Sequence, residues 1–160
     1  MISAVVLTHN SKATMDATLA SLTWCDEIVV IDDGSTDGTA DLVSASARAD
    51  TRVRLLRQPH EGIVAALQAG LGAAAAPLIA RMDADDESYA ERFAAQIDWL
   101  ARGDGVGLVG SLVDFGGDRV TNAGYALHVD WMNSVVTPSD IRLNRFVESP
   151  LAHPSVMFRR

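Results

Sequence analysis

The sequence predicts an α/β fold built on a doubly wound, mainly parallel sheet. Short runs of aliphatic and β-branched residues alternate with segments whose apolar residues recur three or four positions apart, which is the pattern of strands alternating with helices. The runs that form the first strands are apolar throughout, as expected for strands covered by helices on both faces. Acidic residues follow directly where two of these runs end, and parallel α/β sheets bind their ligands beyond the carboxyl ends of their strands.

The elements follow in a regular order along the chain. Strands are expected at residues 2–7, 28–31, 53–56, 78–82 and 106–115. The helices between them are indicated by apolar stripes at helical spacing. The stripes consist of Met15, Leu19 and Leu22; Ala40, Val43 and Ala47; Val64, Leu67 and Leu71; and Phe93, Ile97 and Leu100.

Local residues mark where these helices start and stop. Pro77 ends the third helix, because proline lacks the N–H that a helix interior requires. Ser88 and Glu91 have the spacing of a capping box, which predicts the start of the fourth helix. After residue 116 the pattern weakens, and residues 120–129 are predicted as an antiparallel pair of strands or an excursion from the sheet. Residues 137–140 predict one more helix start, with proline at the first helical position.

The composition excludes several classes of protein. The chain has 160 residues, 48% of them hydrophobic, which suits one domain with a substantial core. Its formal charge is −8 and Lys12 is its only lysine, so it is a poor nucleic-acid binder, because such binding depends on cationic contacts to phosphates. Cys25 is the only cysteine, which fits a reducing, cytoplasmic setting. The first residues are typical of a strand rather than a signal peptide, and no apolar run approaches the roughly 18 residues of a membrane span.

The first acidic turn, residues 32–39, follows the second strand. Its Asp, Ser and Thr side chains can cap the next helix, and Gly34 can adopt a positive φ. Capping does not require Asp33, since a second acid after an apolar strand adds repulsion. Two interpretations therefore stay open for Asp33: a capping loop, or a site in which its carboxylate accepts a hydrogen bond from the N–H of a nucleotide base.

The second acidic turn, residues 83–86, is the sharper indication of function. A turn allows Asp83 and Asp85, which one residue separates, to converge on a cation. The alternative is an acidic helix start favoured by the helix dipole, but Ser88 and Glu91 already have the spacing of a cap. Clustered carboxylates repel one another unless a cation holds them, so we interpret this turn as a site for a hard divalent ion that bridges to phosphate.

Two further segments lie where ligand contacts are common. Thr8, His9 and Asn10 close the first strand, which is the place of both ligand contacts and ordinary loops. Residues 60–62 precede a helix whose N-terminus can receive an anion, although a solvated loop explains His60 equally well.

Near the end of the sequence, His153 precedes the arginine pair Arg159 and Arg160, which can face a diphosphate or simply be solvated. Other familiar motifs are absent. The sequence contains no G-x-G-x-x-G after the first strand, no Walker A motif, no G-x-S-x-G and no H-E-x-x-H. A dinucleotide-binding Rossmann domain is therefore disfavoured.

Together these motifs resemble those of the family 2 glycosyltransferases of GT-A fold. The similar segments are residues 5–10 (VVLTHN), 27–39 (EIVVIDDGSTDGT) and 79–86 (IARMDADD), and residues 153–160 (HPSVMFRR) are similar to a segment of one bacterial branch. The resemblance spans nearly the whole chain. It implies that residues 1–115 form a nucleotide-sugar-binding α/β domain and that residues 116–160 start an acceptor-side region, which we treat as one domain with it.

The resemblance also implies a reaction and a set of residues. The reaction is the metal-dependent transfer of a sugar, with inversion, from a nucleoside-diphosphate sugar to an acceptor hydroxyl. Asp83 and Asp85 match the family's Asp-x-Asp motif; Asp85 would coordinate Mg²⁺ or Mn²⁺ on the diphosphate, and Asp83 would lie near the ribose or the metal. The other residues expected around the nucleotide sugar are Thr8, His9, Asn10, Asp33, Gly62 and Arg81.

The chain departs from the family pattern in places. Ala90 stands where the family usually has proline, and Gln68 where asparagine is common. In the family the catalytic base belongs to an acidic motif downstream of the His-Pro-Ser segment, so no base is assigned here and it is expected beyond Arg160. The sequence is therefore expected to be the N-terminal part of a truncated enzyme, or a domain or subunit that binds its donor without turning it over.

Two rival interpretations stay open. A nucleotidyltransferase would carry a glycine-rich basic loop after the first strand, which residues 8–12 do not provide. An Asp-phosphorylated signalling domain needs a lysine after a late strand, and the only lysine is Lys12. For the glycosyltransferase, the expected partners are a nucleoside-diphosphate sugar and a saccharide or lipid-linked acceptor for an envelope polysaccharide, without nucleic acid. The expected location is the cytoplasm, with peripheral association at the inner face of the membrane and homo-oligomerisation left open.

Overall fold

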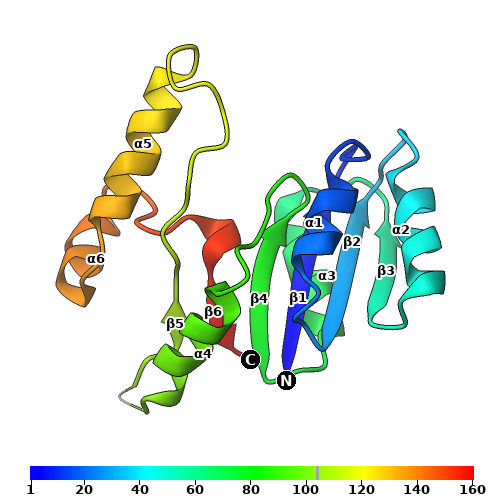
Figure 1. The fold of residues 1–160 in the computed structure, drawn as a ribbon, viewed down its shortest axis with the longest axis horizontal. Helices are drawn as coiled ribbons and strands as arrows, with labels where there is room; N and C mark the ends of the chain where they lie inside the picture. Colours follow the sequence, from blue (N-terminus) through cyan, green and yellow to red (C-terminus); the bar gives the residue numbers. More distant parts are fainter. Residues whose placement is uncertain (104) are drawn as a thin grey trace.

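The computed structural model describes residues 1–103 and 105–160 and confirms the α/β class (Figure 1). Within these residues a six-stranded sheet has the order β3-β2-β1-β4-β6-β5. Strands β1 to β4 are parallel, and β6 runs antiparallel to both of its neighbours. The strands are β1 (Ile2–Thr8), β2 (Glu27–Asp33), β3 (Val53–Gln58), β4 (Leu78–Asp83), β5 (Leu108–Val109) and β6 (Met157–Arg159). The helices are α1 (Met15–Ser21), α2 (Thr39–Ala49), α3 (Ile63–Ala73), α4 (Arg92–Ala101), α5 (Ala123–Ser134), α6 (Pro138–Asn144) and the 3₁₀ turn η1 (His153–Ser155).

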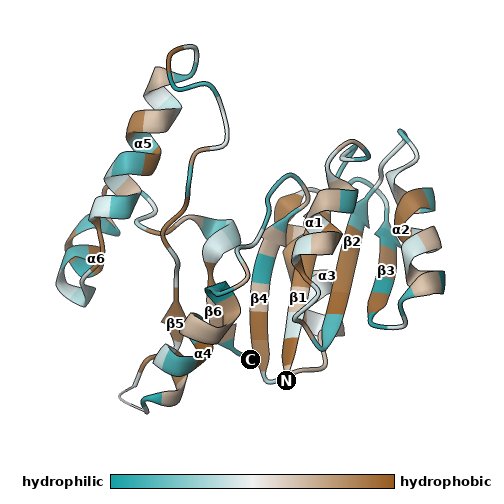
Figure 2. Cartoon of the chain, in the orientation of Figure 1, coloured by the Kyte–Doolittle hydropathy of each residue, from teal (hydrophilic) through white to brown (hydrophobic). Residues whose placement is uncertain are grey.

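Helices cover both faces of the sheet, which explains why its central strands are apolar throughout (Figure 2). One core lies between the sheet and helices α1, α2 and α4; we call this side the α1 face. The second core lies between the sheet and α3, and we call this side the α3 face. Along each strand the side chains alternate between the two faces. The doubly wound arrangement predicted from the sequence is confirmed.

Helix α3 buries a different side from the one predicted. Val64 is 65% exposed and Leu71 is 40% exposed, whereas Ala66 and Gly70 are buried against the sheet. A Cβ atom on Gly70 would lie only 2.4 Å from Cγ1 of Val5 in β1. The predicted stripe was wrong because α3 approaches the sheet so closely that only its small residues fit between them.

The predicted fifth strand is mostly wrong. Of residues 106–115, only Leu108–Val109 form a strand. Further along, the side chain of Asn133 takes both backbone groups of Val113: Nδ2 donates to the carbonyl oxygen at 2.7 Å, and the backbone N–H donates to Oδ1 at 3.0 Å. A neighbouring strand would need these groups, so the chain leaves the sheet here and continues into α5.

Of the two helix starts predicted from capping residues, one is confirmed and the other is wrong. Thr137 and Asp140 form the expected start of α6, a capping box in which the Asp140 N–H donates to Oγ1 of Thr137 at 3.1 Å. The capping box predicted from Ser88 is wrong, since α4 begins only at Arg92 and the Ser88 hydroxyl donates to the carbonyl of Tyr89 instead. Residues 120–129 are also not strands, because they lead into α5, whose Ala126 and Val129 are buried at helical spacing.

Two properties expected from composition can be checked in the fold. Cys25 is buried, and its burial raises the pKa of the thiol to about 12, so it is a core residue and not a nucleophile. Among the helices of the described residues, none combines the length and apolar character that crossing a bilayer requires.

Candidate functional site

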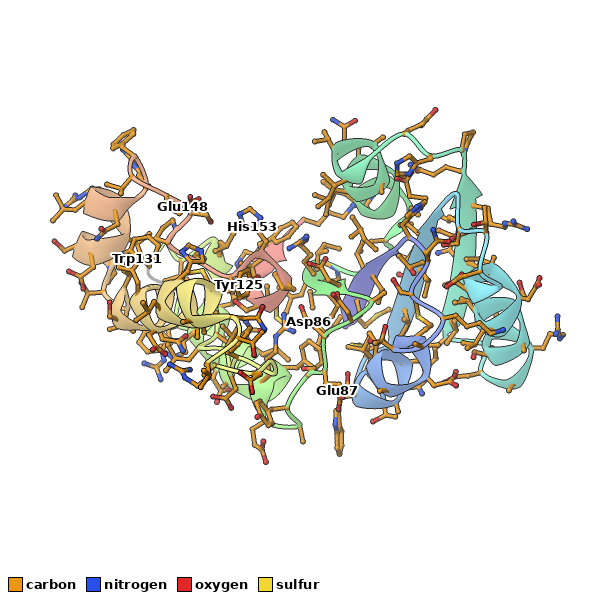
Figure 3. The ribbon with its side chains drawn as sticks, turned by 90° about the horizontal axis from the view of Figure 1, so that it is seen from above. Asp86, Glu87, Tyr125, Trp131, Glu148 and His153 are labelled. Carbon is orange, nitrogen blue, oxygen red and sulfur yellow. The ribbon has the colours of Figure 1, made fainter. Side chains whose placement is uncertain are left out.

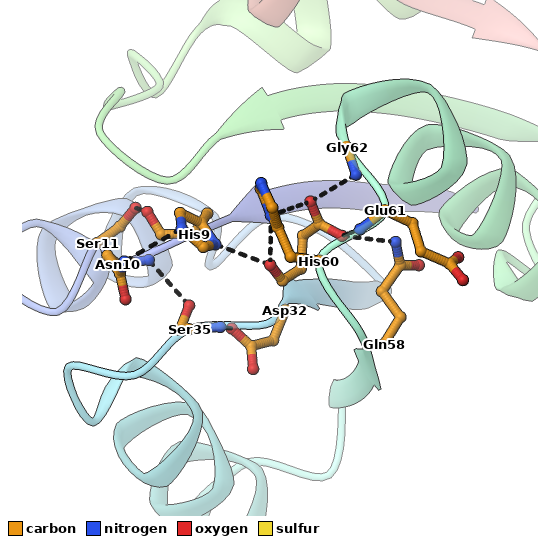
Figure 4. A network of polar contacts seen from close by, with 10 residues as sticks. His9, Asn10, Ser11, Asp32, Ser35, Gln58, His60, Glu61 and Gly62 are labelled. Atoms are coloured by element: carbon orange, nitrogen blue, oxygen red, sulfur yellow. Dashed lines mark hydrogen bonds and ion pairs between the residues drawn. The ribbon is translucent and has the colours of Figure 1, made fainter.

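The carboxylate of Asp33 ties the end of β2 to the loop that leads into α3, through contacts with Gln58, Glu61 and Gly62, which Figure 4 labels. Its Oδ1 accepts hydrogen bonds from Nε2 of Gln58 at 2.8 Å and from the Glu61 N–H at 2.9 Å. Its Oδ2 accepts from the Gly62 N–H at 3.0 Å and lies 3.0 Å from Nδ1 of His60. The hydrogen bond from the Glu61 N–H, followed by those from Gln58 and Gly62, lowers the pKa of Asp33, so the group is an anion at neutral pH.

His9 and Asn10 connect the loops that follow β1 and β2. Nδ1 of His9 lies 2.7 Å from the carbonyl oxygen of Asp33, and its ring is tilted against that of His60 with the centroids 4.4 Å apart. Asn10, in the left-handed region at φ 54°, donates its N–H to Oγ of Ser35 at 2.9 Å. The predicted residues His9, Asn10 and Asp33 therefore lie together at one edge of the sheet.

Thr8 lies on the other side of this edge. It follows Ala4 and Val6 on the α1 face, whereas Asp33 follows Val29 and Ile31 on the α3 face. The partner of Thr8 across the strands is Asp32, a residue that the sequence did not single out. Among the described residues, Oγ1 of Thr8 and Oδ2 of Asp32 are buried without a hydrogen-bond partner. The structure thus pairs Thr8 with Asp32 and places it on the face opposite Asp33.

Asp37 fixes the loop between β2 and α2. Its Oδ1 accepts from the Thr39 N–H at 2.9 Å and from the Thr39 hydroxyl at 2.5 Å, and its Oδ2 accepts from the Lys12 N–H at 3.0 Å. These hydrogen bonds, the one from the Thr39 hydroxyl first, lower the pKa of Asp37 from its ordinary 3.8 to about 2. A carboxyl whose pKa is lower in the folded state stabilises the fold above its unfolded-state pKa, and this contribution is lost as the pH falls through the folded-state value.

We therefore expect Asp37→Ala to lower the free energy of unfolding at pH 7, and the gap to wild type to close between pH 3.8 and about 2. Urea unfolding followed by circular dichroism at several pH values measures this gap. Asp98→Ala, which removes an exposed acid on α4, is the matched control and is expected to change little. A gap that stays constant down to pH 2 would contradict the role of Asp37.

Hydroxyl groups of α1 and of the segment before it hydrogen-bond to the backbone of the second acidic turn. Oγ1 of Thr14 donates to the carbonyl of Ala84 at 2.7 Å, and Oγ1 of Thr18 lies 2.9 Å from the carbonyls of both Ala84 and Asp86. The Ala84 N–H also donates to the carbonyl of Leu7 in β1, at 3.1 Å. These contacts fix the backbone of the turn and leave its carboxylates free for other partners.

The three carboxylates of this turn crowd one another. Asp83 is half-buried and pairs with the buried Arg81, whose Nη2 lies 2.9 Å from Oδ1. Burial raises the pKa of Asp83, and the Asp85 charge adds to this effect while Arg81 opposes it. Burial, then the charges of Asp83 and Asp85, raises the pKa of Asp86 to about 6. Asp85 itself is exposed.

Both acidic turns lie at the same edge of the sheet and on the same face. Asp33 ends β2 and Asp83 ends β4, and each continues the side of its strand that faces α3, after Ile31 and Ile79. Only β1 separates the two strands, with Leu7 in register with Asp83. Neighbouring strands lie about 4.8 Å apart, and Asp33 lies two residues further along than Asp83, so roughly 12 Å separates these strand ends. One nucleoside diphosphate is long enough to reach both.

The turn at the end of β4 has the chemistry that a hard divalent cation requires. Carboxylate oxygens are the preferred ligands of Mg²⁺ and Mn²⁺, and the charge of Asp85 lies close enough to raise the pKa of both Asp83 and Asp86. Within the described residues no group of three or more His, Cys, Asp or Glu side chains is arranged to hold an ion by itself. The carboxylates of this turn fit an ion that takes its remaining ligands from phosphate oxygens, as Mg²⁺ commonly does.

The residues around β6 are divided between the two ends of the sheet. His153 is close enough to Asp83 to act on its pKa, and it hydrogen-bonds Oγ of Ser149 through Nε2 at 2.9 Å. Arg159, in contrast, is in register with Leu78 at the start of β4, and the Arg160 N–H donates to the carbonyl of Pro77. The arginine pair lies at the opposite edge from the aspartates, so the idea that it faces a diphosphate bound there is wrong.

A cavity of about 470 Å³ lies on the α3 face, beside the aspartates rather than over them. Most of its lining is apolar and comes from α3, β4 and residues 149–158, and Arg81 and His153 are the lining residues nearest to the acidic turn. Among the described residues, Nε and Nη1 of the buried Arg81 have no hydrogen-bond partner. Figure 3 looks down on this end of the sheet from above and labels His153 and Asp86.

Comparison with solved structures identifies the fold. The chain aligns over 99% of its length with the mannosyltransferase PcManGT of Pyrobaculum calidifontis, solved with GDP-Man and Mn²⁺, at 23% identity and a TM-score of 0.67, covering 44% of that protein. It aligns equally far with glucosyl-3-phosphoglycerate synthase of Mycobacterium tuberculosis, solved with Mn²⁺, UDP and phosphoglyceric acid, at 23% identity and a TM-score of 0.64, covering 55% of that chain. The fold is that of the GT-A glycosyltransferases.

The family model of glycosyl transferase family 2 matches residues 3–160, and the chain belongs to this family. An uncharacterized glycosyltransferase of Haemophilus influenzae is 29% identical over 119 residues, which are 71% of this chain and 37% of the relative. The lipopolysaccharide core biosynthesis glycosyltransferase LpsC of Rhizobium meliloti is 35% identical over 85 residues, 53% of this chain and 32% of the relative. The chain thus spans about a third of the length of these relatives. Family membership favours a glycosyltransferase over the nucleotidyltransferase and signalling-domain alternatives.

Proposed function

We propose that this chain is the donor-binding part of a glycosyltransferase that transfers a sugar from a nucleoside-diphosphate sugar to an acceptor hydroxyl, with inversion and with a divalent metal ion. The observation that carries the proposal is the position of Asp33 and Asp83 on the same face at the same edge of the sheet. A donor that lies along this edge meets a hydrogen-bonding carboxylate at its base and an acidic turn at its diphosphate.

At the nucleotide end, the proposal assigns Asp33 to the base and places Asn10, His9 and Gly62 around it. The structure supports this through the hydrogen bonds that join the loops after β1 and β2 and the start of α3. Thr8 belongs to the proposed site only as a partner of Asp32 behind it, because it lies on the α1 face. These contacts hold the loops at one edge before the ligand arrives, which lowers the entropy lost on binding.

At the diphosphate end, Asp85 is the proposed ligand of Mg²⁺ or Mn²⁺, and Asp83 the second candidate ligand. Asp85 is exposed, while Asp83 is held in place by Arg81. A bound cation neutralises the charge of the leaving diphosphate. In the proposed complex, Arg81 orients Asp83 and thereby the turn. The base that deprotonates the acceptor hydroxyl is not assigned to any residue of this chain.

The acceptor side is proposed to start with residues 116–160. By its name LpsC acts in lipopolysaccharide core biosynthesis, which supports a saccharide or lipid-linked acceptor of the cell envelope. For such an acceptor the proposed location is the cytoplasm at the inner face of the membrane.

Isothermal titration of UDP and GDP, with and without Mn²⁺, tests the proposal. We expect the wild-type chain to bind a nucleoside diphosphate at least about tenfold more tightly with Mn²⁺, an increment of roughly 1.4 kcal/mol. Asp85→Ala is expected to abolish the increment and to leave the metal-free affinity unchanged. Asp98→Ala has the same change in charge on α4 and should keep the increment. An equal effect of Mn²⁺ on the Asp85 variant would contradict the role of Asp85, and absence of nucleotide binding by the wild type would contradict the function.

A further inference from the structure

Four aromatic side chains form a continuous row along α5 and the segment before it, which we call the aromatic row. The ring centroids of Phe115 and Tyr125 lie 5.5 Å apart, those of Tyr125 and His128 lie 6.3 Å apart, and those of His128 and Trp131 lie 5.6 Å apart. The last three residues are spaced three positions apart, so they follow one another along one side of the helix.

The aromatic row is not part of a hydrophobic core. Helix α5 buries Ala126 and Val129 instead. The ring of Tyr125 is 63% exposed, and the other three rings of the row are half-buried. Adjacent apolar side chains that stay in contact with water commonly form a binding surface.

Hydrogen bonds fix the aromatic row beside the acidic turn that follows β4. The side chain of Asn133 takes both backbone groups of Val113, which joins α5 to the segment before it. The hydroxyl of Tyr89, three residues after Asp86, donates to Oδ2 of Asp114 at 2.7 Å, and the first ring of the row belongs to the next residue. The row therefore begins next to the turn at which the diphosphate of the donor is proposed to lie.

The position of α5 in the fold agrees with these contacts. The helix stands beside the sheet and reaches past the carboxyl ends of its parallel strands (Figure 1). In the view from above, Tyr125 lies between Asp86 and Trp131 (Figure 3). A ligand on the aromatic row would thus extend outward from the proposed donor site.

The charges beside the aromatic row cancel. Arg119, in the segment before α5, forms an ion pair with Asp130 on the helix. Asp114 adds an acid next to the first ring, and the chain as a whole carries a charge of −8. Nucleic acids and anionic membranes bind to surfaces with clustered, unpaired cations. This surface therefore suits an uncharged ligand.

We propose that the aromatic row binds the saccharide of the acceptor, with sugar rings lying flat on the aromatic rings. An aromatic face carries partial negative charge, and the C–H groups on one face of a pyranose ring carry partial positive charge. The hydroxyl groups at the rim of the sugar stay in water or hydrogen-bond to the Tyr125 hydroxyl and the His128 ring. Because four rings follow one another, the row fits an oligosaccharide of several sugar units. The inference rests on the proposed function and deepens it by naming the class of acceptor.

Tryptophan fluorescence in the presence of UDP and Mg²⁺ tests this inference. The chain has three tryptophans, so replacing Trp24 and Trp99 by phenylalanine leaves Trp131 as the sole reporter. The probes are the mono-, di- and tetrasaccharides of the cellulose, maltose and chitin series. We expect at least one series to change the emission of Trp131, with an affinity that rises with the number of sugar units. No change with any probe, or an affinity independent of chain length, would overturn the inference.

Variants of Tyr125 separate binding from structure. Tyr125→Ala removes the exposed ring and is expected to weaken binding of the tetrasaccharide by about fivefold or more in isothermal titration. Tyr125→Phe keeps the ring and should retain most of the affinity. Trp99→Ala, which removes an exposed ring on α4 outside the row, is the matched control and should change nothing. An unchanged affinity of Tyr125→Ala, or an equal loss in Tyr125→Phe, would contradict stacking on the ring.

Other occupants of the aromatic row would give different results. If light scattering finds a wild-type dimer that Tyr125→Ala converts to monomers, a second copy covers the row and the inference is overturned. The same holds if phosphatidylglycerol vesicles bind the wild type but not Tyr125→Ala. If the wild type binds UDP with Mg²⁺ but none of the oligosaccharides, the inference fails while the proposed function stands. If it binds neither, both fall.

Discussion

Replacing Gly70 by alanine is expected to lower the free energy of unfolding by about 1–2 kcal/mol. The added Cβ would lie 2.4 Å from Cγ1 of Val5 and 3.2 Å from Cγ1 of Ile31, both buried in the core. Overpacking of this kind costs about 1–3 kcal/mol, and the better helix propensity of alanine offsets up to about 1 kcal/mol of it. Urea unfolding monitored by circular dichroism measures the net change.

The same substitution two residues further along α3 is the matched control. A Cβ on Gly72 would meet no atom within 4 Å, so Gly72→Ala is expected to stabilise the chain by about 0.5–1 kcal/mol through helix propensity alone. The two variants should therefore change stability in opposite directions. If both stabilise the chain to the same extent, the close contact between α3 and β1 does not exist in solution.

Replacing Asp33 by asparagine is expected to affect both the stability of the site and its affinity for nucleotide. Asparagine keeps the shape of the side chain, but it turns one acceptor oxygen into an amide group that donates. This amide would face an N–H of Glu61 or Gly62, which is left without an acceptor. We expect a lower melting temperature, faster amide exchange at the start of α3, and UDP binding weakened by about tenfold or more.

Asp98→Asn makes the same chemical change at an exposed position on α4 and should leave all three measurements unchanged. If Asp33→Asn loses nucleotide affinity while amide exchange at residues 61 and 62 stays slow, Asp33 contacts the base but does not hold the loop. If exchange accelerates and the affinity stays the same, the assignment of Asp33 to the base is wrong.

The strands of the parallel half could be predicted because their patterns depend on burial alone. Continuous apolar runs are typical of strands that helices cover on both faces, and β1, β2 and β4 begin and end within two residues of the predicted positions. The edge strand β5 was predicted too long. The amide side chain of Asn133 satisfies the backbone where the strand would continue. Such a long-range side-chain contact leaves no trace in the local sequence pattern.

The buried side of α3 shows a second limit of pattern analysis. The helix is apolar almost all round, so a hydrophobic stripe does not define which side faces the sheet. The decisive quantity is the distance of approach, which Gly70 permits. A glycine within an apolar helix was the available signal, and it was not used.

The candidate site was predicted in part. Its acidic turns were located because polar residues that follow apolar strands are conspicuous, and parallel topology brings their ends to one edge. The pairing of Thr8 with Asp32 on the α1 face was accessible from strand alternation, once the register was known. The hydrogen bonds to the Asp33 carboxylate were not, because its three donors lie 25 to 29 residues away in sequence and two of them are backbone groups.

The hydroxyl groups of Thr14 and Thr18 support the backbone of the acidic turn after β4, a role that the sequence of α1 did not indicate. The backbone of the acidic turn after β4 rests on these two side chains, which come some 70 residues earlier. The turn therefore depends on α1 for its conformation. If residues 83–86 were transferred alone into another protein, they would keep their carboxylates but lose the threonine hydrogen bonds that orient the turn. In related chains, a change at either threonine position and a change in the turn are expected to go together.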